Sequence, residues 1–258
     1  MKDKTMQKFV VTAAGGNATA IGVVQERQSR SWYETEGKKL EKEFPLLGVE
    51  QVGFIVLSDN HFEMSGGEFC GNGSRAAGLM FAKLLGKTEG HIFTTSGHNG
   101  EMSVEIKDIA GQHPHVIGVF PSLGAVAKSV EISQIDKAQI VDLDGIVHII
   151  VYGTIPSSKE AYEAEHRRIT EELGLQNRSA VGVDWVALHD DEVEMHPVVW
   201  VRSIETFFYE TSCGSGSISA AIATGHNNVR QPSGEMILVG NRNGVMTIAS
   251  KMEVIHGT

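Results

Sequence analysis

Residues 70–74 read CGNGS and residues 213–217 read CGSGS, so a cysteine followed by a glycine-rich turn and a serine occurs twice. Each stretch leads into a run of small and apolar residues, and the chain of 258 residues has no other cysteine. Residues 100–102 and 234–236, which both read GEM, form a weaker echo of the same duplication. An internal repeat of this kind predicts two similar halves that face each other.

Four segments have the periodicity of helices. The runs that follow the cysteine turns, residues 74–85 and 217–224, are rich in small and apolar side chains, which is typical of buried central helices. Residues 31–44 and 158–173 are charged and amphipathic, which predicts helices with one solvated face.

Runs of β-branched residues dominate the rest of the chain and predict strands. The sequence NRNG at residues 241–244 predicts a hairpin turn between the last two of them. The predicted strands are 8–12, 53–57, 102–106, 115–120, 139–141, 148–152, 185–188, 198–203, 236–239 and 245–248.

Composition narrows the class of protein. Hydrophobic residues make up 41% of the chain and charged residues 21%, as in ordinary globular proteins. The net charge of −10 argues against nucleic acid and anionic membranes as partners, because both attract basic surfaces. No stretch approaches the roughly 20 apolar residues of a membrane span, and the start of the chain lacks the pattern of a secretion signal. With two cysteines and no disulfide framework, we expect a cytoplasmic protein.

The cysteine turns suggest a chemistry. The start of a helix offers unpaired N–H groups and partial positive charge, and glycines let a carboxylate approach that backbone closely. A thiol at the same place is expected to have a lowered pKa and to act as a base or nucleophile. Two such turns facing each other would hold a carboxylate between two sulfurs, of which one thiolate removes a proton and one thiol returns a proton on the opposite face.

Other interpretations of the cysteines are less consistent with the sequence. Lone cysteines are usually small buried hydrophobes, but the duplicated turn argues against that role. The glycines at 71, 73 and 78 have the wrong spacing for a dinucleotide site, and there is no Cys-x-x-Cys redox motif. Neither cysteine has a partner at metal-ligand spacing, and none of the 11 histidines forms His-Glu-x-x-His.

At these residues the chain resembles the cofactor-independent racemases of the diaminopimelate epimerase family. The resemblance also includes Gly16-Asn17, Gln51 and the QPSG turn at residues 231–234. It implies an α/β fold of two pseudo-symmetric halves, each a β-rich barrel around a central helix, with the active site in the cleft between them. We place the halves at residues 1–125, with Cys70, and 126–258, with Cys213. The resemblance implies catalysis without pyridoxal phosphate or metal.

The family residues that surround the reacting carbon all have counterparts in this sequence. Cys70 and Cys213 fall on the two catalytic cysteines. The family's carboxylate-gripping amides fall on Gly71-Asn72 and Gly214-Ser215. Asn17 and Gln51 match polar residues that line the family's site. Glu205 matches, with one gap, a family glutamate near the substrate's amino group.

The resemblance breaks down where diaminopimelate would place its distal amino acid centre. The family arginine is replaced by Thr206, and the asparagines of that pocket by Glu63, Ile146 and Gly182. A distal carboxylate would be left unpaired, at a cost of about 2–5 kcal/mol, and Glu63 would repel it. Diaminopimelate is therefore disfavoured as the substrate.

A closer resemblance is to the histidine racemase branch known from staphylopine-type metallophore synthesis. It rests on the strings EQVGFI (50–55), MSG (64–66), EFCGN (68–72) and SCGSG (212–216). The expected function is thus inversion of the α-carbon of a free amino acid, histidine above all. Glu63 or Glu205 could accept an imidazole N–H, or bind another basic side chain.

Three alternatives stay open at this point. One is a diaminopimelate epimerase with a rebuilt distal pocket, another a non-catalytic amino-acid-binding protein of the same fold, and the third a thiol peroxidase. The expected partner in every case but the last is a small amino acid, and a homodimer is compatible with the sequence.

Overall fold

The sheet of the N-terminal half closes into a barrel. The computed structural model describes residues 6–121 and 123–257, so residues 1–5, on which the expectation about the chain's start partly rests, lie outside the described residues. The barrel closes because its last strand pairs with both the seventh and the first. In spatial order its strands are β1 (Lys8–Ala13), β2 (Gly16–Val24), β3 (Val49–Val56), β4 (His61–Met64), β5 (Gly90–Thr95), β6 (Glu101–Lys107), β7 (His115–Phe120) and β16 (Val245–Gly257).

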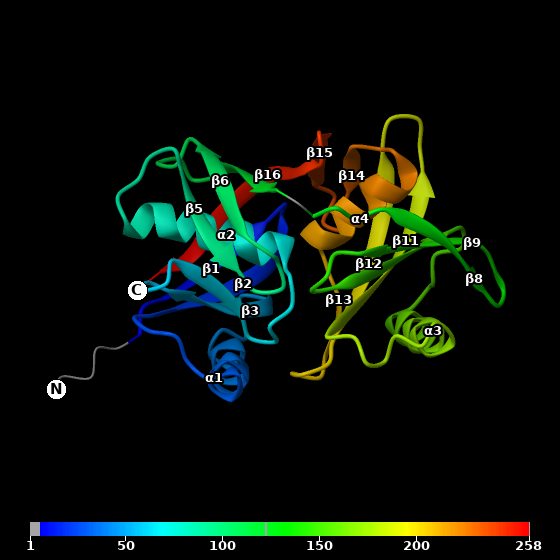
Figure 1. Ribbon diagram of the computed structural model, residues 1–258, viewed down its shortest axis with the longest axis horizontal. Coiled ribbons are helices and arrows are strands. Elements are labelled where there is room, and N and C mark those ends of the chain that lie inside the picture. The colour runs from blue at the N-terminus through cyan, green and yellow to red at the C-terminus, as the bar shows by residue number, and fades with distance from the viewer. Residues whose placement is uncertain (1–5, 122, 258) are drawn as a thin grey trace.

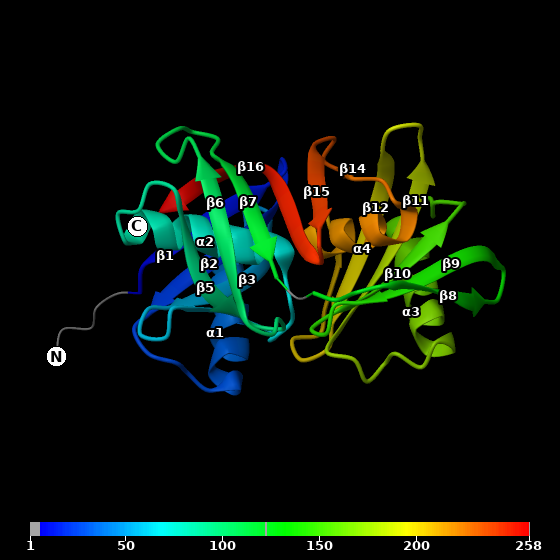
Figure 2. The same ribbon diagram turned by 45° about the horizontal axis from the view of Figure 1, so that its top comes forward.

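The C-terminal half continues the same sheet from β16. Its strands curve around a second helix (Figures 1 and 2), and among the described pairings β8 forms the free edge. A further strand, β13 (Thr206–Tyr209), pairs with β12. From the edge inwards the strands are β8 (Ala127–Ile132), β9 (Ile135–Asp142), β10 (Val147–Tyr152), β11 (Ala180–Leu188), β12 (Val193–Val201), β14 (Asn228–Arg230) and β15 (Met236–Arg242).

The two halves repeat one topology. In the first, α1 (Arg30–Glu43) connects the parallel strands β2 and β3, and α2 (Gly71–Leu84) connects the parallel strands β4 and β5. In the second, α3 (Lys159–Glu172) connects β10 to β11, and a short strand followed by α4 (Gly214–Thr224) connects β12 to β14, again in parallel pairs. The expected α/β fold of two pseudo-symmetric halves is confirmed.

All four predicted helices are present, and their environments are as predicted. Helices α2 and α4 run inside the two halves and are buried over most of their length. Helices α1 and α3 lie on the outside (Figure 1), each covering a separate apolar cluster with one face. Tyr33 and Leu40 of α1 pack towards Phe54, and Tyr162 of α3 packs against Trp185.

Several strands were not predicted, among them β4 and β5, in which polar residues interrupt the apolar pattern, and β13, which has only four residues. The predicted hairpin turn is confirmed: Arg242 pairs with Val245, and Asn243 and Gly244 between them both have positive φ. The division at residues 125 and 126 stays a prediction, and β16 returns from the second half to complete the first barrel. Within residues 6–121 and 123–257, no helix combines the length and apolar character needed to cross a membrane.

Candidate active site

Each cysteine caps the start of a central helix. Cys70 precedes α2 and Cys213 precedes α4, with the same extended backbone angles, φ −130° and ψ 112°. Cys70 Sγ accepts a hydrogen bond from the N–H of Gly73 (3.1 Å), and Cys213 Sγ accepts one from Gly216 (3.3 Å). Both cysteines are buried. The duplicated sequence therefore builds one local structure twice.

The two helix starts touch each other. A Cβ atom on Gly71 would lie 3.1 Å from the backbone nitrogen of Ser215, and one on Gly214 would lie 2.9 Å from that of Asn72. The amide of Asn72 also donates to the carbonyl of Ser212 (3.0 Å). Glycine at 71 and 214 thus allows the positive ends of two helices to converge, and the first N–H groups of a helix have no acceptor within it. Converging N–H groups of this kind suit a carboxylate.

A cavity of about 230 Å³ opens beside these helix starts, between the two halves. Among the predicted residues, Gln51, Cys70 and Ser215 line it. Cys213 lies behind Ser215, its Sγ 3.6 Å from Ser215 Oγ. The other lining residues are Gly37, Lys38, Glu41, Lys42, Glu50, Val52, Ser65, Glu68, Phe69, Ile146, Val199, Val201, Ile204, Thr206, Phe208 and Glu210.

Gln51 connects the first cysteine to a carboxylate of the other half. The Cys70 thiol donates to Gln51 Oε1 (2.9 Å), and Gln51 Nε2 donates to Glu210 Oε1 (2.9 Å). Asn17 is buried nearby: its backbone N–H donates to Thr211 Oγ1 (2.8 Å) and its amide to Glu50 (3.4 Å). Asn17 therefore supports the cavity wall, although it does not line the cavity itself.

The structure does not bring Glu63 or Glu205 to the cavity wall. Both carboxylate oxygens of Glu63, on β4, are occupied, one by Arg30 and one by His61. Glu205 is exposed in a turn and has a positive φ of 57°, whereas Ile204 beside it lines the cavity.

Four carboxylates that were not predicted as site residues line the cavity instead, those of Glu41, Glu50, Glu68 and Glu210. Burial raises the pKa of Glu68 to about 7 and the pKa of Glu210 to about 8, and it also raises the pKa of Glu50. In Glu68 and Glu210, the Oε2 atom is buried without a hydrogen-bond partner. Both precede a cysteine closely, Cys70 and Cys213 respectively, and this proximity was the signal that could have identified them.

A second missed feature is a buried chain of polar groups behind Cys213. His148 Nδ1 donates to Asp184 Oδ2 (2.8 Å), and His148 Nε2 lies 3.0 Å from Ser215 Oγ. The side chains of His148 and Asp184 are fully buried. Gly182, where the family has a pocket asparagine, leaves the space that the His148 ring occupies, because a Cβ there would collide with the ring.

The expected lowering of the thiol pKa values is wrong. Burial raises the pKa of Cys70 and Cys213 above the ordinary range, and the negative charge of Glu210 raises both further. The N–H groups of Gly73 and Gly216 lower them, but by less than desolvation raises them. Both thiols are therefore protonated at neutral pH unless positive charge enters the cavity.

Relatives of the chain were found by sequence. The family model described as the histidine racemase CntK N-terminal domain matches residues 8–254. A histidine racemase of Fusobacterium nucleatum is 30% identical over 175 residues, which are 66% of this chain but only 63% of that protein, less than two thirds of its length. A histidine racemase of Staphylococcus aureus is 26% identical over 216 residues, which are 75% of this chain and 74% of that protein.

Solved structures share the fold. A hydroxyproline epimerase from Agrobacterium vitis, with bound trans-4-OH-L-proline, superposes with a TM-score of 0.64 at 12% identity, over 100% of this chain and 93% of that one. A phenazine biosynthesis protein of the PhzF family from Enterococcus faecalis superposes with a TM-score of 0.58 at 12% identity, over 98% and 97% of the two chains. At such identities the likeness concerns the fold alone.

Proposed function

Because the chain belongs to the family described by the histidine racemase CntK N-terminal domain, we propose that it racemises a free amino acid, histidine above all, with Cys70 and Cys213 as the two acid–base groups. The observation that carries this proposal is the contact between the two cysteine-capped helix starts beside one cavity. The reaction needs a carboxylate grip, an ammonium site and two proton-transfer groups on opposite faces of one carbon.

The substrate's α-carboxylate would bind at the converging helix starts. The N–H groups of residues 71, 72, 214 and 215 belong to the first turns of α2 and α4, where the helix dipoles place partial positive charge. Two helices contribute to one anion site, so the α-carbon attached to that carboxylate would lie between the two caps. In that position, one cysteine could remove the α-proton from one face of the carbon and the other could return a proton to the opposite face.

Glu210 is the candidate partner of the α-ammonium. Its charge raises the pKa of both Cys70 and Cys213, so it acts on both thiols, and its Oε2 has no hydrogen-bond partner. An ammonium group beside Glu210 would offset this repulsion and favour a thiolate. Substrate binding itself would then supply the positive charge that lets one of the buried thiols release its proton to solvent and become a thiolate.

Proton transfer follows from this charge balance. One cysteine, as the thiolate, takes the α-proton and becomes a thiol, while the other, as a thiol, gives its proton to the opposite face of the carbanion and becomes a thiolate. The pair is left with exchanged protonation states, ready for the reverse direction. On the Cys213 side, Ser215 connects the sulfur to the buried His148–Asp184 pair and holds that side of the site in place.

Histidine is favoured over diaminopimelate by the charges of the cavity. Four carboxylates line it, those of Glu41, Glu50, Glu68 and Glu210, against two lysines, Lys38 and Lys42, and no arginine does so among the described residues. A second carboxylate on the substrate would meet these acids, whereas an imidazole would meet hydrogen-bond acceptors. The curated relatives support the same choice, since both are named histidine racemases.

The proposal includes the cellular location of the enzyme, its assembly and the use of its product. Two free buried thiols suit the reducing cytoplasm, and an acidic chain suits neither nucleic acid nor anionic membranes. We include in it a homodimer, with which the sequence is compatible, and the use of D-histidine in metallophore synthesis, which the family resemblance implies.

The deciding experiment is proton NMR of L-histidine in D₂O with the reduced protein, beside L,L-diaminopimelate and other amino acids. Loss of the histidine α-proton signal, with D-histidine appearing on a chiral column, is the expected result. Turnover of diaminopimelate and not of histidine would show that diaminopimelate is the substrate. Binding of an amino acid without exchange of its α-proton would show that the protein is a non-catalytic amino-acid carrier.

A further inference from the structure

Glu68, a residue of the cavity wall, has a buried carboxylate oxygen without a partner. Its side chain is 6% exposed and lines the cavity, yet its Oε2 has no hydrogen-bond partner. Buried polar atoms are nearly always paired, so an unpaired carboxylate oxygen in a cavity wall indicates the position of a donor on a bound molecule. The mechanism above does not use Glu68.

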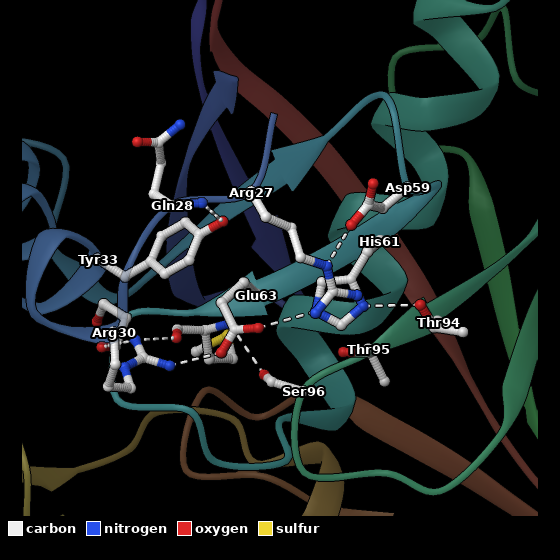
Figure 3. A network of polar contacts seen from close by, with 12 residues as sticks. Arg27, Gln28, Arg30, Tyr33, Asp59, His61, Glu63, Thr94, Thr95 and Ser96 are labelled. Atoms are coloured by element: carbon white, nitrogen blue, oxygen red, sulfur yellow. Dashed lines mark hydrogen bonds and ion pairs between the residues drawn. The ribbon is translucent and has the colours of Figure 1, made fainter. Parts of the chain in front are cut away.

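The neighbouring Glu63 cannot play this part, as Figure 3 shows. Arg30 Nη1 donates to one of its carboxylate oxygens and His61 Nε2 to the other (2.8 Å), while His61 Nδ1 lies 2.7 Å from Thr94 Oγ1. A new donor to Glu63 would have to displace one of these partners. The carboxylate of Glu63 is thus committed to holding Arg30 and His61.

Arg30 in turn anchors the segment that carries Glu68. Its guanidinium donates to the carbonyl of Met64 (2.8 Å) and to that of Ser65. It also approaches Gly67 closely: a Cβ there would lie 2.9 Å from Nη1, and Gly67 has a positive φ of 79°. The contacts of Arg30 therefore hold the turn that leads from β4 to Glu68.

Glu68, just before α2, comes from the N-terminal half, and Glu210, just before α4, comes from the C-terminal half. Glu210 raises the pKa of both thiols, whereas Glu68 raises that of Cys70 and is itself affected by Arg30 and Glu63. A Cβ on Gly66 would collide with Glu68 Oε2, so this oxygen lies beside the Gly66 backbone. Val201 approaches the same turn, because a Cβ on Gly66 would lie 2.5 Å from its Cγ1.

We propose that Glu68 is the specificity residue of this site, accepting an N–H of the substrate's imidazole side chain while Val199, Val201 and Ile204 pack against the ring. The inference rests on the proposed function, since it needs a free amino acid bound between the two cysteines. It assigns to Glu68 the role that the sequence analysis gave to Glu63 or Glu205.

The test compares two substrates in three variants. The rate of α-proton exchange in D₂O is measured for L-histidine and for 3-(2-thienyl)-L-alanine, whose ring is of similar size but has no N–H. Glu68→Met is expected to lower kcat/KM for histidine by about 10-fold or more, mainly through KM, and to change thienylalanine by less than about 3-fold. Glu68→Gln should recover part of the loss, because its amide oxygen still accepts. Glu105→Gln, at an exposed position on β6, is the matched control.

A binding measurement complements turnover. Calorimetric titration with free imidazole should detect binding to the wild type and weaker binding to Glu68→Met. Equal losses for both substrates, or no loss for histidine, would overturn the inference and leave the racemase proposal standing. A wild-type protein that does not exchange the histidine α-proton would overturn the proposed function, and this inference with it.

Discussion

Gly71 and Gly214 lie against each other where the two halves of the protein meet. A Cβ atom on Gly71 would be 3.1 Å from the carbonyl carbon of Gly214, and one on Gly214 would be 3.0 Å from that of Gly71. These distances are shorter than ordinary van der Waals contacts, and the atoms involved are backbone, which cannot turn away. The separation of the two cysteine caps is therefore set by the absence of a Cβ atom at residues 71 and 214.

Gly214→Ala should consequently push the helix starts apart. We expect a loss of stability of about 1–3 kcal/mol from overpacking and a loss of racemase activity of about 100-fold from the misplaced caps. Thermal unfolding and α-proton exchange measure the two effects. Gly86→Ala is the control, because Gly86 has a positive φ of 65° but open space around it. It should lose stability and keep its activity.

Replacing either cysteine by serine should abolish racemisation without unfolding the protein. Serine is a good helix N-cap, so Cys70→Ser and Cys213→Ser keep the caps of α2 and α4, whereas alanine would cost about 1 kcal/mol at each. We expect turnover to fall by about 10²–10⁴-fold, the usual contribution of a general acid or base. Chiral chromatography of the product measures it, and full activity in either serine variant would refute the two-base mechanism.

Stability should fall as the pH rises from about 4.5 to 8. The pKa of Glu210 is raised from 4.5 in the unfolded chain to about 8 by burial. Between these values the native protein keeps a proton that the unfolded chain has lost, so the unfolding free energy decreases with pH. The thermal midpoint of the wild type should be lower at pH 8 than at pH 5. Glu210→Gln should reduce that difference, and an unchanged difference would contradict the assignment.

His148 and Asp184 should be strongly coupled. His148→Leu leaves the Asp184 carboxylate buried without its partner, which typically costs about 3–5 kcal/mol. Asp184→Leu alone should also destabilise the protein, and the double variant should lose less than the sum of the two. Chemical denaturation of the three variants gives the coupling energy, which we expect to exceed about 1 kcal/mol. Additive losses would show that the pair does not act as a unit.

Much of the fold could be predicted from local sequence. Residues 71–84 and 214–224 were recognisable because small residues follow a capping cysteine, and the family match over residues 8–254 confirms the resemblance to histidine racemases. The helices begin at glycines 71 and 214, three residues earlier than predicted, because Cys70 and Cys213 act as the caps. Strand β4 was missed because its His61 and Glu63 are stabilised by Thr94 and Arg30, which lie about thirty residues away.

The cavity was harder to predict than the reacting centre. His148 and Asp184 meet only because β10 and β11 pair in parallel with His148 opposite Gly182, a register that no short motif encodes. Glu68 precedes Cys70 by two residues, whereas Glu210 precedes Cys213 by three. The repeat in the sequence therefore did not align the two glutamates with each other. Glu205 matched a family position in sequence, but its turn faces solvent.

The path of β16 has a consequence for how the protein is made. This strand pairs with β7 and β1, yet almost half of the chain separates it from β7. While the ribosome is still synthesising the second half, β1 and β7 therefore remain open edges that can pair with other chains. The first barrel can close only after the last strand has left the exit tunnel, so the two halves mature together although the first is synthesised long before the second.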